Sequence, residues 1–470
     1  MILKKIASPG CFHVRDRLPM TLAIYNILLI IIGIFFFPVF LLITLSRKKY
    51  RGRTLERLGL KSKEIKDALA KSKSVEGKTT NSPVIWIHAL SVGEVTSALP
   101  LVKGLRADIA DAIIILTVAT SSGKKIAKNL LSCHVQLILS SPFDLRFAVR
   151  RYIAAFRPDI FILVETDFWP NWLTLLQKKG IPTMLVNGRI SKKSFTAYQR
   201  FAFFFKPMFR SFDLLSMQTE EDCRKMTMLA VAADKVIALG NLKYDMERPN
   251  EEENQGTLPE LAGEDTTFVW VCGSTHPGEE EILFAAFAHL LARQDIQNIK
   301  ELKEQPFLVL APRDINRGQE LVHLAGSFGL EAGRRSCGKQ KGQVLILDTL
   351  GELALCYSQA DLAFVGGSLV SQGGHNPIEP AIHGVPILFG PHMEDFSEIA
   401  RELLDCGGGE TVTVDSLTET ISTLLVDKEA RFHMGQTAYE LVERHRGGVQ
   451  RHMQAIQGLL HHAALSHAGQ

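Results

Sequence analysis

Short apolar runs recur along most of the chain, and between them lie longer segments in which apolar residues recur at helical spacing. Runs this short and this apolar predict strands that are buried on both faces of a parallel sheet, with helices as the crossover connections. The runs fall into two series, at 84–90, 112–118, 135–139, 160–164, 183–187, 214–217 and 236–238, and then at 267–272, 307–311, 344–347, 362–365 and 386–389. The pattern therefore predicts two doubly wound α/β domains.

The two series are separated by residues 247–263, which are acidic, poor in apolar residues and contain Pro249 and Pro259. Such composition is typical of a linker. A chain of 470 residues also exceeds one ordinary core. We therefore expect an N-terminal segment at 1–50, domains at 51–246 and 264–445, and a C-terminal tail or helix at 446–470.

Residues 20–45 are almost wholly apolar, which is enough for a helix to cross the roughly 30 Å hydrocarbon core of a bilayer. Arg47, Lys48 and Lys49 follow at once, and this flank predicts a membrane anchor with the bulk of the protein in the cytoplasm. Basic residues also precede the segment, so its orientation stays open. A monotopic insertion is the alternative, and Pro38 would suit a bent helix.

Charge and cysteine content exclude several classes of function. The chain has 53 Lys and Arg against 50 Asp and Glu, so no overall field favours nucleic acid. Its seven cysteines form no CxxC pair, which predicts reduced thiols and a reducing compartment. Histidines and carboxylates show no spacing typical of a metal site, and we expect no metal.

Polar residues that directly follow predicted strands are the candidates for chemistry in such a fold. In the first series Glu94 opens a helix, where it could serve as a base, although an ordinary first-turn glutamate is an equal alternative. Glu165 directly follows a buried strand, an unfavourable place for a charge unless it is paired or used. Lys243 could supply a cation to a phosphate or a carboxylate, the alternative being a solvated surface lysine.

In the second series the predicted strand 362–365 runs into glycines, and a helix then begins with Asn376 as its N-cap, Pro377 first and Glu379 third. Glycines followed by a helix N-terminus predict backbone amides that face a crevice and bind a phosphate. The alternative is that Glu379 only caps its helix and the glycines only turn the chain. Other strand-end candidates in this series are Gly273, Ser274 and Thr275, Pro312 and Arg313, and Gly351 and Glu352.

Several collinear motifs together resemble one family, the bacterial 3-deoxy-D-manno-octulosonic acid (Kdo) transferases. These motifs are WIHALSVGE (86–94), VETDFWPN (164–171), NGRIS (187–191), GNLK (240–243), APR (311–313), and GGS (366–368) with GHNPIE (374–379). The resemblance runs in order from the apolar segment to about residue 410.

This resemblance implies a GT-B fold with an N-terminal membrane anchor at the inner membrane. It implies an inverting, metal-independent transfer of Kdo from CMP-Kdo to a tetraacylated lipid A precursor, at the cytoplasmic leaflet and without a cofactor. Glu94 matches the catalytic base of the family, and Glu165 and Lys243 match positions that stabilise the transition state. The residues that match the CMP-binding segments are Pro312, Arg313, Gly351, Glu352, Leu353, Asn376, Pro377, Ile378 and Glu379, with Gly273, Ser274 and Thr275 as further donor contacts.

Two alternatives remain open. The first is a GT-B transferase that uses a UDP-sugar, and competition between CMP and UDP for the donor site would distinguish it from a Kdo transferase. The second is a catalytically silent membrane-bound nucleotide sensor, which would show no turnover. A dinucleotide oxidoreductase is disfavoured because no GxGxxG follows the first predicted strand.

Overall fold

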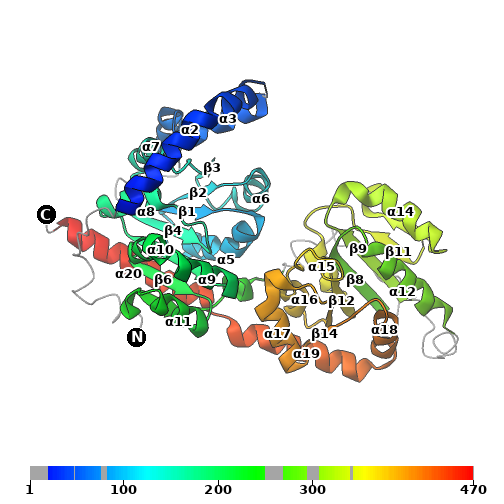
Figure 1. Cartoon of the computed structure of the whole chain (residues 1–470). Coiled ribbons are helices and arrows are strands. Elements are labelled where there is room, and N and C mark those ends of the chain that lie inside the picture. The colour runs from blue at the N-terminus through cyan, green and yellow to red at the C-terminus, as the bar shows by residue number, and fades with distance from the viewer. Residues whose placement is uncertain are drawn as a thin grey trace. The chain divides into compact units, whose positions relative to one another are not determined.

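The computed structural model describes residues 20–46, 48–75, 82–248, 268–293, 306–338 and 342–468. These residues form two compact units (Figure 1). Unit 1 runs to Asp245 and resumes at Gly447, and unit 2 runs from Met246 to Arg446. Most of the predicted linker, from residue 249 on, lies outside the described residues.

Unit 1 is built on a parallel sheet whose strand order is β3-β2-β1-β4-β5-β6-β7. The order reverses between β1 and β4, which is the switch point where open α/β sheets place their ligands. The strands are β1 (Val84–Ala89), β2 (Ile113–Val118), β3 (Leu137–Ser140), β4 (Ile160–Val164), β5 (Thr183–Gly188), β6 (Leu214–Met217) and β7 (Val236–Ala238).

Both faces of this sheet are covered, because alternate strand residues point to opposite sides. Trp86 packs on one face with Trp172, and Ile85 and Ile87 pack on the other. The helices of unit 1 are α2 (Met20–Ser46), α3 (Lys48–Arg57), α4 (Ser62–Val75), α5 (Val92–Asp108), α6 (Ser121–Leu131), α7 (Arg146–Phe156), α8 (Pro170–Lys178), α9 (Lys192–Arg200), α10 (Ala202–Arg210), α11 (Glu220–Met228) and α20 (Gly448–Ala468), with short 3₁₀ turns η1 (Ala233–Lys235) and η2 (Leu242–Asp245).

The C-terminal helix α20 completes unit 1 although it follows unit 2 in the sequence. Its residues Met453, Ile456 and Leu459 are buried in the same core as α5, and the two helices lie against each other. His452 is fully buried there, with its Nε2 2.7 Å from the Ser216 Oγ of β6. The chain therefore needs its last helix to close the first sheet.

Unit 2 repeats the design with a parallel sheet of order β10-β11-β9-β8-β12-β13-β14, which reverses between β8 and β12. Its strands are β8 (Phe268–Thr275), β9 (Pro306–Pro312), β10 (Ala332–Arg334), β11 (Val344–Ile346), β12 (Leu362–Val365), β13 (Ile387–Phe389) and β14 (Gly409–Thr411). Its helices are α12 (Glu280–Ala292), α14 (Gly318–Ser327), α15 (Leu353–Tyr357), α16 (Ile378–Ala381), α17 (Ser397–Cys406), α18 (Leu417–Val426) and α19 (Lys428–His445), with turns η3 (Ile315–Arg317), η4 (Arg335–Cys337) and η5 (Glu394–Phe396).

The prediction of two doubly wound α/β sheets is confirmed, and the predicted apolar runs form the seven strands described in the unit 1 sheet and the five inner strands of the unit 2 sheet. The short edge strands β10 and β14 were not predicted. Their sequences, AGR and GET, contain no apolar run that would predict a strand.

The N-terminal helix α2 contains the whole segment, 20–45, for which the sequence predicted a membrane span. No helix among the described residues has the length and apolar character needed to cross a bilayer. Helix α2 is held to unit 1 by Tyr25, whose hydroxyl donates to Asp144 Oδ2 at 2.8 Å, and by the buried Leu22.

Candidate active site

Glu94 lies at the carboxyl end of β1, in the first turn of α5, and its side chain is only 4% exposed. One carboxylate oxygen accepts from the Leu90 amide, and the other is 3.4 Å from the Thr166 hydroxyl that donates to it. Burial raises the pKa of Glu94, and the hydrogen bond from Leu90 partly offsets this effect. The negative charges of Glu165 and Asp167 also raise the pKa, which reaches about 8.

This pKa corrects the electrostatic part of the prediction. From its place at the start of a helix alone, Glu94 is expected to have a stabilised carboxylate, because the N-terminal end of the helix dipole favours negative charge by typically less than about 1 kcal/mol. Burial among other carboxylates outweighs that effect and favours the proton instead. A carboxylate with such proton affinity is a stronger base than an exposed glutamate and is still ionised in part near neutral pH.

Glu165 follows β4 directly, so it lies beside Glu94 across the switch point of the sheet. Its backbone has a φ of +59°, a left-handed conformation that is uncommon for residues other than glycine. Its Oε1 accepts from Asn187 Nδ2 at 3.1 Å, and Asn187 itself has a φ of +56°. Backbone strain at two residues in contact is typical of functional sites, where the surrounding structure holds side chains in a required position.

Asn187 joins Glu165 to the segment that contains Lys243. The Asn187 Oδ1 accepts from the Leu242 amide at 3.0 Å, and the Lys243 amide donates to Asn241 Oδ1 at 3.0 Å. The Lys243 side chain is partly exposed. The structure therefore brings Glu94 and Glu165 together and places the backbone of Lys243 close to Glu165.

A buried pair that the sequence reading missed lies next to these acids. His88 is fully buried in β1, and its Nε2 is 2.7 Å from Asp167 Oδ2. The other ring nitrogen, Nδ1, lies 3.0 Å from both Thr117 O and Thr117 Oγ1. A histidine in the middle of an otherwise apolar run was the available signal, because a buried polar ring needs partners.

In unit 2 the ends of β8 and β12 approach each other closely. A Cβ on Gly366 would lie 2.4 Å from the Ser274 carbonyl oxygen, and one on Gly273 would lie 1.9 Å from the Tyr357 hydroxyl. Ser274 has a φ of +59°, and Thr275 pairs with Pro312 of β9. Gly273, Ser274 and Thr275 thus lie at the switch point of this sheet, as predicted for strand-end residues.

The predicted phosphate site at the glycines after β12 is wrong in one respect. The fully buried carboxylate of Glu279 accepts from the amides of Gly367, Ser368 and Leu369 at 2.6, 2.9 and 2.9 Å, and from the His276 amide at 2.9 Å. An acidic side chain of the protein already occupies these donors, so they are not open to an anion. Glu279 was not identified from the sequence.

The predicted N-cap at Asn376 is wrong by one residue, because the N-cap is Pro377, and the helix is shorter than expected. Helix α16 spans only Ile378–Ala381, and Asn376 Oδ1 accepts from the Ile378 amide at 3.2 Å. Glu379 is partly buried, which raises its pKa, while a hydrogen bond from Asn376 at 3.5 Å and the charge of Arg313 act in the opposite direction. Asn376, Pro377, Ile378 and Glu379 therefore form one compact turn near Arg313.

Arg313 is exposed at the end of β9, and its charge also acts on a histidine pair. His276 and His375 have nearly parallel rings with centroids 5.2 Å apart, and their Nε2 atoms are 2.9 Å apart. Burial first, then the charges of Arg313 and His276, lower the pKa of His375 to about 4. The pair is therefore neutral near pH 7 and contains one N–H between the two Nε2 atoms.

The segment at Gly351, Glu352 and Leu353 lies where α15 begins. Glu352 Oε1 is 2.8 Å from Arg335 Nη2, and Thr349 donates to Oε2. Partial burial acts to raise the pKa of Glu352, but the hydrogen bonds from Arg335 and Thr349 lower it on balance. Glu352 is thus an ionised, paired carboxylate. Within the described residues, no three histidine, cysteine or acidic side chains are grouped as a metal site would require.

Comparisons with known proteins place the chain in a family. Residues 53–246 match the family model "3-Deoxy-D-manno-octulosonic-acid transferase (kdotransferase)". The 3-deoxy-D-manno-octulosonic acid transferase of Haemophilus influenzae is 33% identical over 84% of this chain and 92% of its own length. The enzyme of that name from Aquifex aeolicus is 30% identical over 77% of this chain and 94% of its own length.

Two solved structures that share the fold are much more distant in sequence than these relatives. UDP-GlcNAc 2-epimerase from Neisseria meningitidis, bound to UDP-GlcNAc, is 13% identical, with a TM-score of 0.53 over 80% of this chain and 99% of that one. Anabaena HepE in complex with UDP and glucose is 15% identical, with a TM-score of 0.52 and the same coverage. These likenesses concern the fold alone, whereas the sequence relatives show that the chain belongs to the 3-deoxy-D-manno-octulosonic acid transferase family.

Proposed function

We propose that this protein transfers Kdo from CMP-Kdo to a tetraacylated lipid A precursor, with inversion at the anomeric carbon and with Glu94 as the base. Membership of the transferase family supports the sugar and the reaction class. The observation that carries the assignment of the base is the burial of Glu94 at the switch point of the unit 1 sheet, together with its raised pKa.

In this reaction the Glu94 carboxylate accepts the proton of the acceptor hydroxyl as that oxygen attacks the anomeric carbon. The bond between that carbon and the phosphate oxygen of CMP breaks, and CMP leaves with the electron pair. Glu165 and Asp167 act on the base, because their negative charges increase its affinity for the proton. A single displacement of this kind inverts the anomeric centre.

Unit 2 is proposed to bind the donor. Arg313 at the end of β9 provides an exposed cation for the phosphate, and the turn from Asn376 to Glu379 lies near it. Glu379 would accept from ribose hydroxyls, as charge-assisted hydrogen bonds of this kind are strong. Lys243 of unit 1 is proposed as a second cation that stabilises the leaving group. No metal enters this scheme.

We further propose that the protein works at the cytoplasmic face of the inner membrane, with α2 in contact with the bilayer. The support is the set of large apolar side chains that α2 exposes, which are Ile24, Ile27, Leu28, Ile30, Ile31, Ile32, Ile34, Phe35 and Phe36. Phe201 and Phe203, at and just after the start of α10, are exposed as well, while Phe209 of the same helix is buried. A large exposed apolar patch is typical of a surface that contacts a membrane or a partner.

The test is to incubate the purified full chain with CMP-Kdo and a tetraacylated lipid A precursor in the presence of a chelator, and to weigh the lipid product. A mass increase by one or more Kdo residues is the expected result. Addition of CMP should inhibit the reaction, and UDP should not. An unchanged lipid mass, or inhibition by UDP alone, would overturn the proposal.

A further inference from the structure

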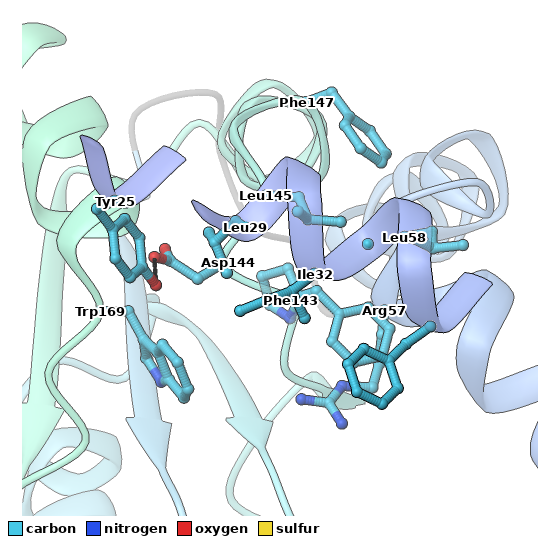
Figure 2. A pocket seen from close by; sticks show the side chains of 13 residues that line it. Tyr25, Leu29, Ile32, Arg57, Leu58, Phe143, Asp144, Leu145, Phe147 and Trp169 are labelled. Atoms are coloured by element: carbon cyan, nitrogen blue, oxygen red, sulfur yellow. Dashed lines mark hydrogen bonds between the residues drawn. The ribbon is translucent and has the colours of Figure 1, made fainter. Parts of the chain in front are cut away.

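Unit 1 has an apolar pocket of about 610 Å³ between α2 and the loop that joins β3 to α7 (Figure 2). This volume is in the range of roughly 300–1,000 Å³ that is usual for ligand sites. Helix α2 supplies one wall, and the end of α3, the loop and Trp169 supply the others. The lining residues are Tyr25, Leu29, Ile32, Gly33, Phe36, Arg57, Leu58, Pro142, Phe143, Asp144, Leu145, Phe147 and Trp169.

The few polar groups in the wall are mostly paired within the protein. The Tyr25 hydroxyl donates to Asp144 Oδ2, which is drawn in Figure 2, and the Asp144 Oδ1 accepts from the Trp172 amide at 3.2 Å. Burial raises the pKa of Asp144 to about 7, although these hydrogen bonds oppose the shift. A ligand in this part of the pocket therefore gains from apolar contact and not from hydrogen bonds, which suits a hydrocarbon.

Helix α2 is apolar on more than the side that forms the pocket. Leu29 and Gly33 line the pocket, whereas Ile30 and Ile34 are 60% and 69% exposed, and Phe35 is 77% exposed. A helix that is apolar all round is not stable facing water on its other sides. The pocket wall therefore continues into a surface suited to lipid, from which an acyl chain could enter without crossing water.

The polar end of the pocket is formed by Arg57. Its guanidinium lies over the Phe143 ring, 4.1 Å from the ring centroid, and its Nε donates to the Ser141 carbonyl at 3.0 Å. In the view of Figure 2 the guanidinium and Phe147 lie at opposite ends of the set of side chains. Burial, and then the positive charge of Arg53, lower the pKa of Arg57. Because these effects disfavour the charged guanidinium of Arg57, an anion bound beside Arg53 and Arg57 would stabilise it.

Arg57 also links the pocket to the candidate active site. The carboxylate of Asp167 acts electrostatically on both Arg57 and Glu94, so the polar end of the pocket and the proposed base lie within range of one charge. The polar head of a molecule bound at Arg57 would therefore lie within electrostatic range of Asp167.

We propose that this pocket binds one acyl chain of the lipid acceptor, and that Arg57 contacts the anionic head of the same molecule. This proposal rests on the proposed function, since it assumes that the acceptor is an acylated, phosphorylated glycolipid. It assigns α2 a role in substrate recognition in addition to contact with the bilayer.

Gly33 allows a direct test, because a Cβ at this position meets no atom within 4 Å and leucine favours a helix more than glycine does. Gly33→Leu adds a bulky apolar side chain at a position that lines the pocket. Ile34→Phe enlarges an apolar side chain on the exposed side of the same helix, at a position that does not line the pocket, and is the control. The probe is a tetraacylated lipid A precursor with a photoactivatable diazirine in one acyl chain, in phosphatidylglycerol vesicles without CMP-Kdo.

The expected result is cross-linking of the wild-type chain at residues 142–147, which falls on the order of tenfold in Gly33→Leu and is unchanged in Ile34→Phe. With CMP-Kdo present, Gly33→Leu should raise KM for the acylated acceptor and leave turnover of a deacylated acceptor unchanged. Equal labelling in both variants, or equal labelling by a diazirine phosphatidylglycerol, would overturn the proposal. Transfer to the acceptor without labelling of the pocket would refute the pocket alone, whereas absence of both would refute the proposed function.

Discussion

The two units end their sheets in the same way but place opposite chemistry there. At the switch point of unit 1 lie three carboxylates, Glu94, Glu165 and Asp167, and burial raises the proton affinity of the first. At the switch point of unit 2 the buried carboxylate, Glu279, is held by four backbone amides. Near the same strand ends lie the exposed Arg313 and the neutral pair of His276 and His375.

The two sites show how the surroundings of a buried carboxylate determine its affinity for a proton. A buried carboxylate that receives several amide hydrogen bonds is a structural element, because its lone pairs are satisfied. A buried carboxylate with few hydrogen-bond donors and with like charges nearby has a raised pKa and readily accepts a proton. One fold has thus produced a site suited to base chemistry in unit 1 and a rigid loop beside a cation in unit 2.

The largest expected effect of a substitution is on turnover. Glu94→Gln keeps the size and one hydrogen-bond acceptor but cannot take up a proton, so we expect kcat to fall by about 10²–10⁴-fold, the usual contribution of a general base. The measurement is transfer of sugar to the acceptor, with CMP binding followed in parallel. Glu220→Gln, in the exposed first turn of α11, is the matched control and should be silent. Wild-type turnover in Glu94→Gln would show that the base is another group.

The next effect is on stability and belongs to unit 2. Glu279→Ala leaves the amides of Gly367, Ser368 and Leu369 buried without an acceptor, at about 1–3 kcal/mol for each unsatisfied group. We expect the unfolding transition of unit 2 to move to clearly lower urea concentration. Glu281→Ala, two residues along on the exposed side of α12, should leave the transition in place. A stable Glu279→Ala protein would mean that water or an anion replaces the carboxylate.

The sequence predicted the central strands and the acids Glu94 and Glu165 because both depend on local order along the chain. An apolar run predicts a buried strand, and a polar residue just after it must lie at the sheet edge. The contacts that decide the chemistry of these residues are not local. The hydrogen bond between Glu279 and Gly367 joins residues 88 apart, and that between His88 and Asp167 joins residues 79 apart.

The same limit explains the error at the glycine-rich stretch. The sequence near Gly366 shows amides that need an acceptor, but it does not show which acceptor they receive. A glutamate in the turn before α12 and a phosphate satisfy the same donors equally well. Only the three-dimensional structure places Glu279 against them.

A third expected effect is on pH dependence, and activity and stability should change in opposite directions. The pKa of Glu94 is about 8 in the folded chain, above the ordinary value of 4.5. Because the ionised form is the base, kcat/KM should rise with pH up to about 8 and then level off. The folded state binds this proton more tightly than the unfolded state, so its contribution to stability falls as pH rises from about 4.5 through about 8.

Both changes should disappear together in Glu94→Gln, which has no proton to lose. The measurements are kcat/KM for the acceptor and the urea midpoint, each across neutral and mildly alkaline pH. An activity profile that is already level from pH 5 upward would show that Glu94 is ionised as easily as an exposed glutamate.

The smallest expected effect tests whether the acids of unit 1 act on one another. Asp167→Asn removes one of the two charges that raise the pKa of Glu94, while asparagine Oδ1 can still accept from His88 Nε2. The rise of kcat/KM should therefore move to lower pH, by less than about one unit for a partly screened charge. Asp159→Asn is the matched control, because Asp159 accepts from the Val84 amide at the opposite end of β1. If both variants keep the wild-type profile, the proton affinity of Glu94 comes from burial alone, and the contrast between the two units reduces to the number of amides that each buried carboxylate receives.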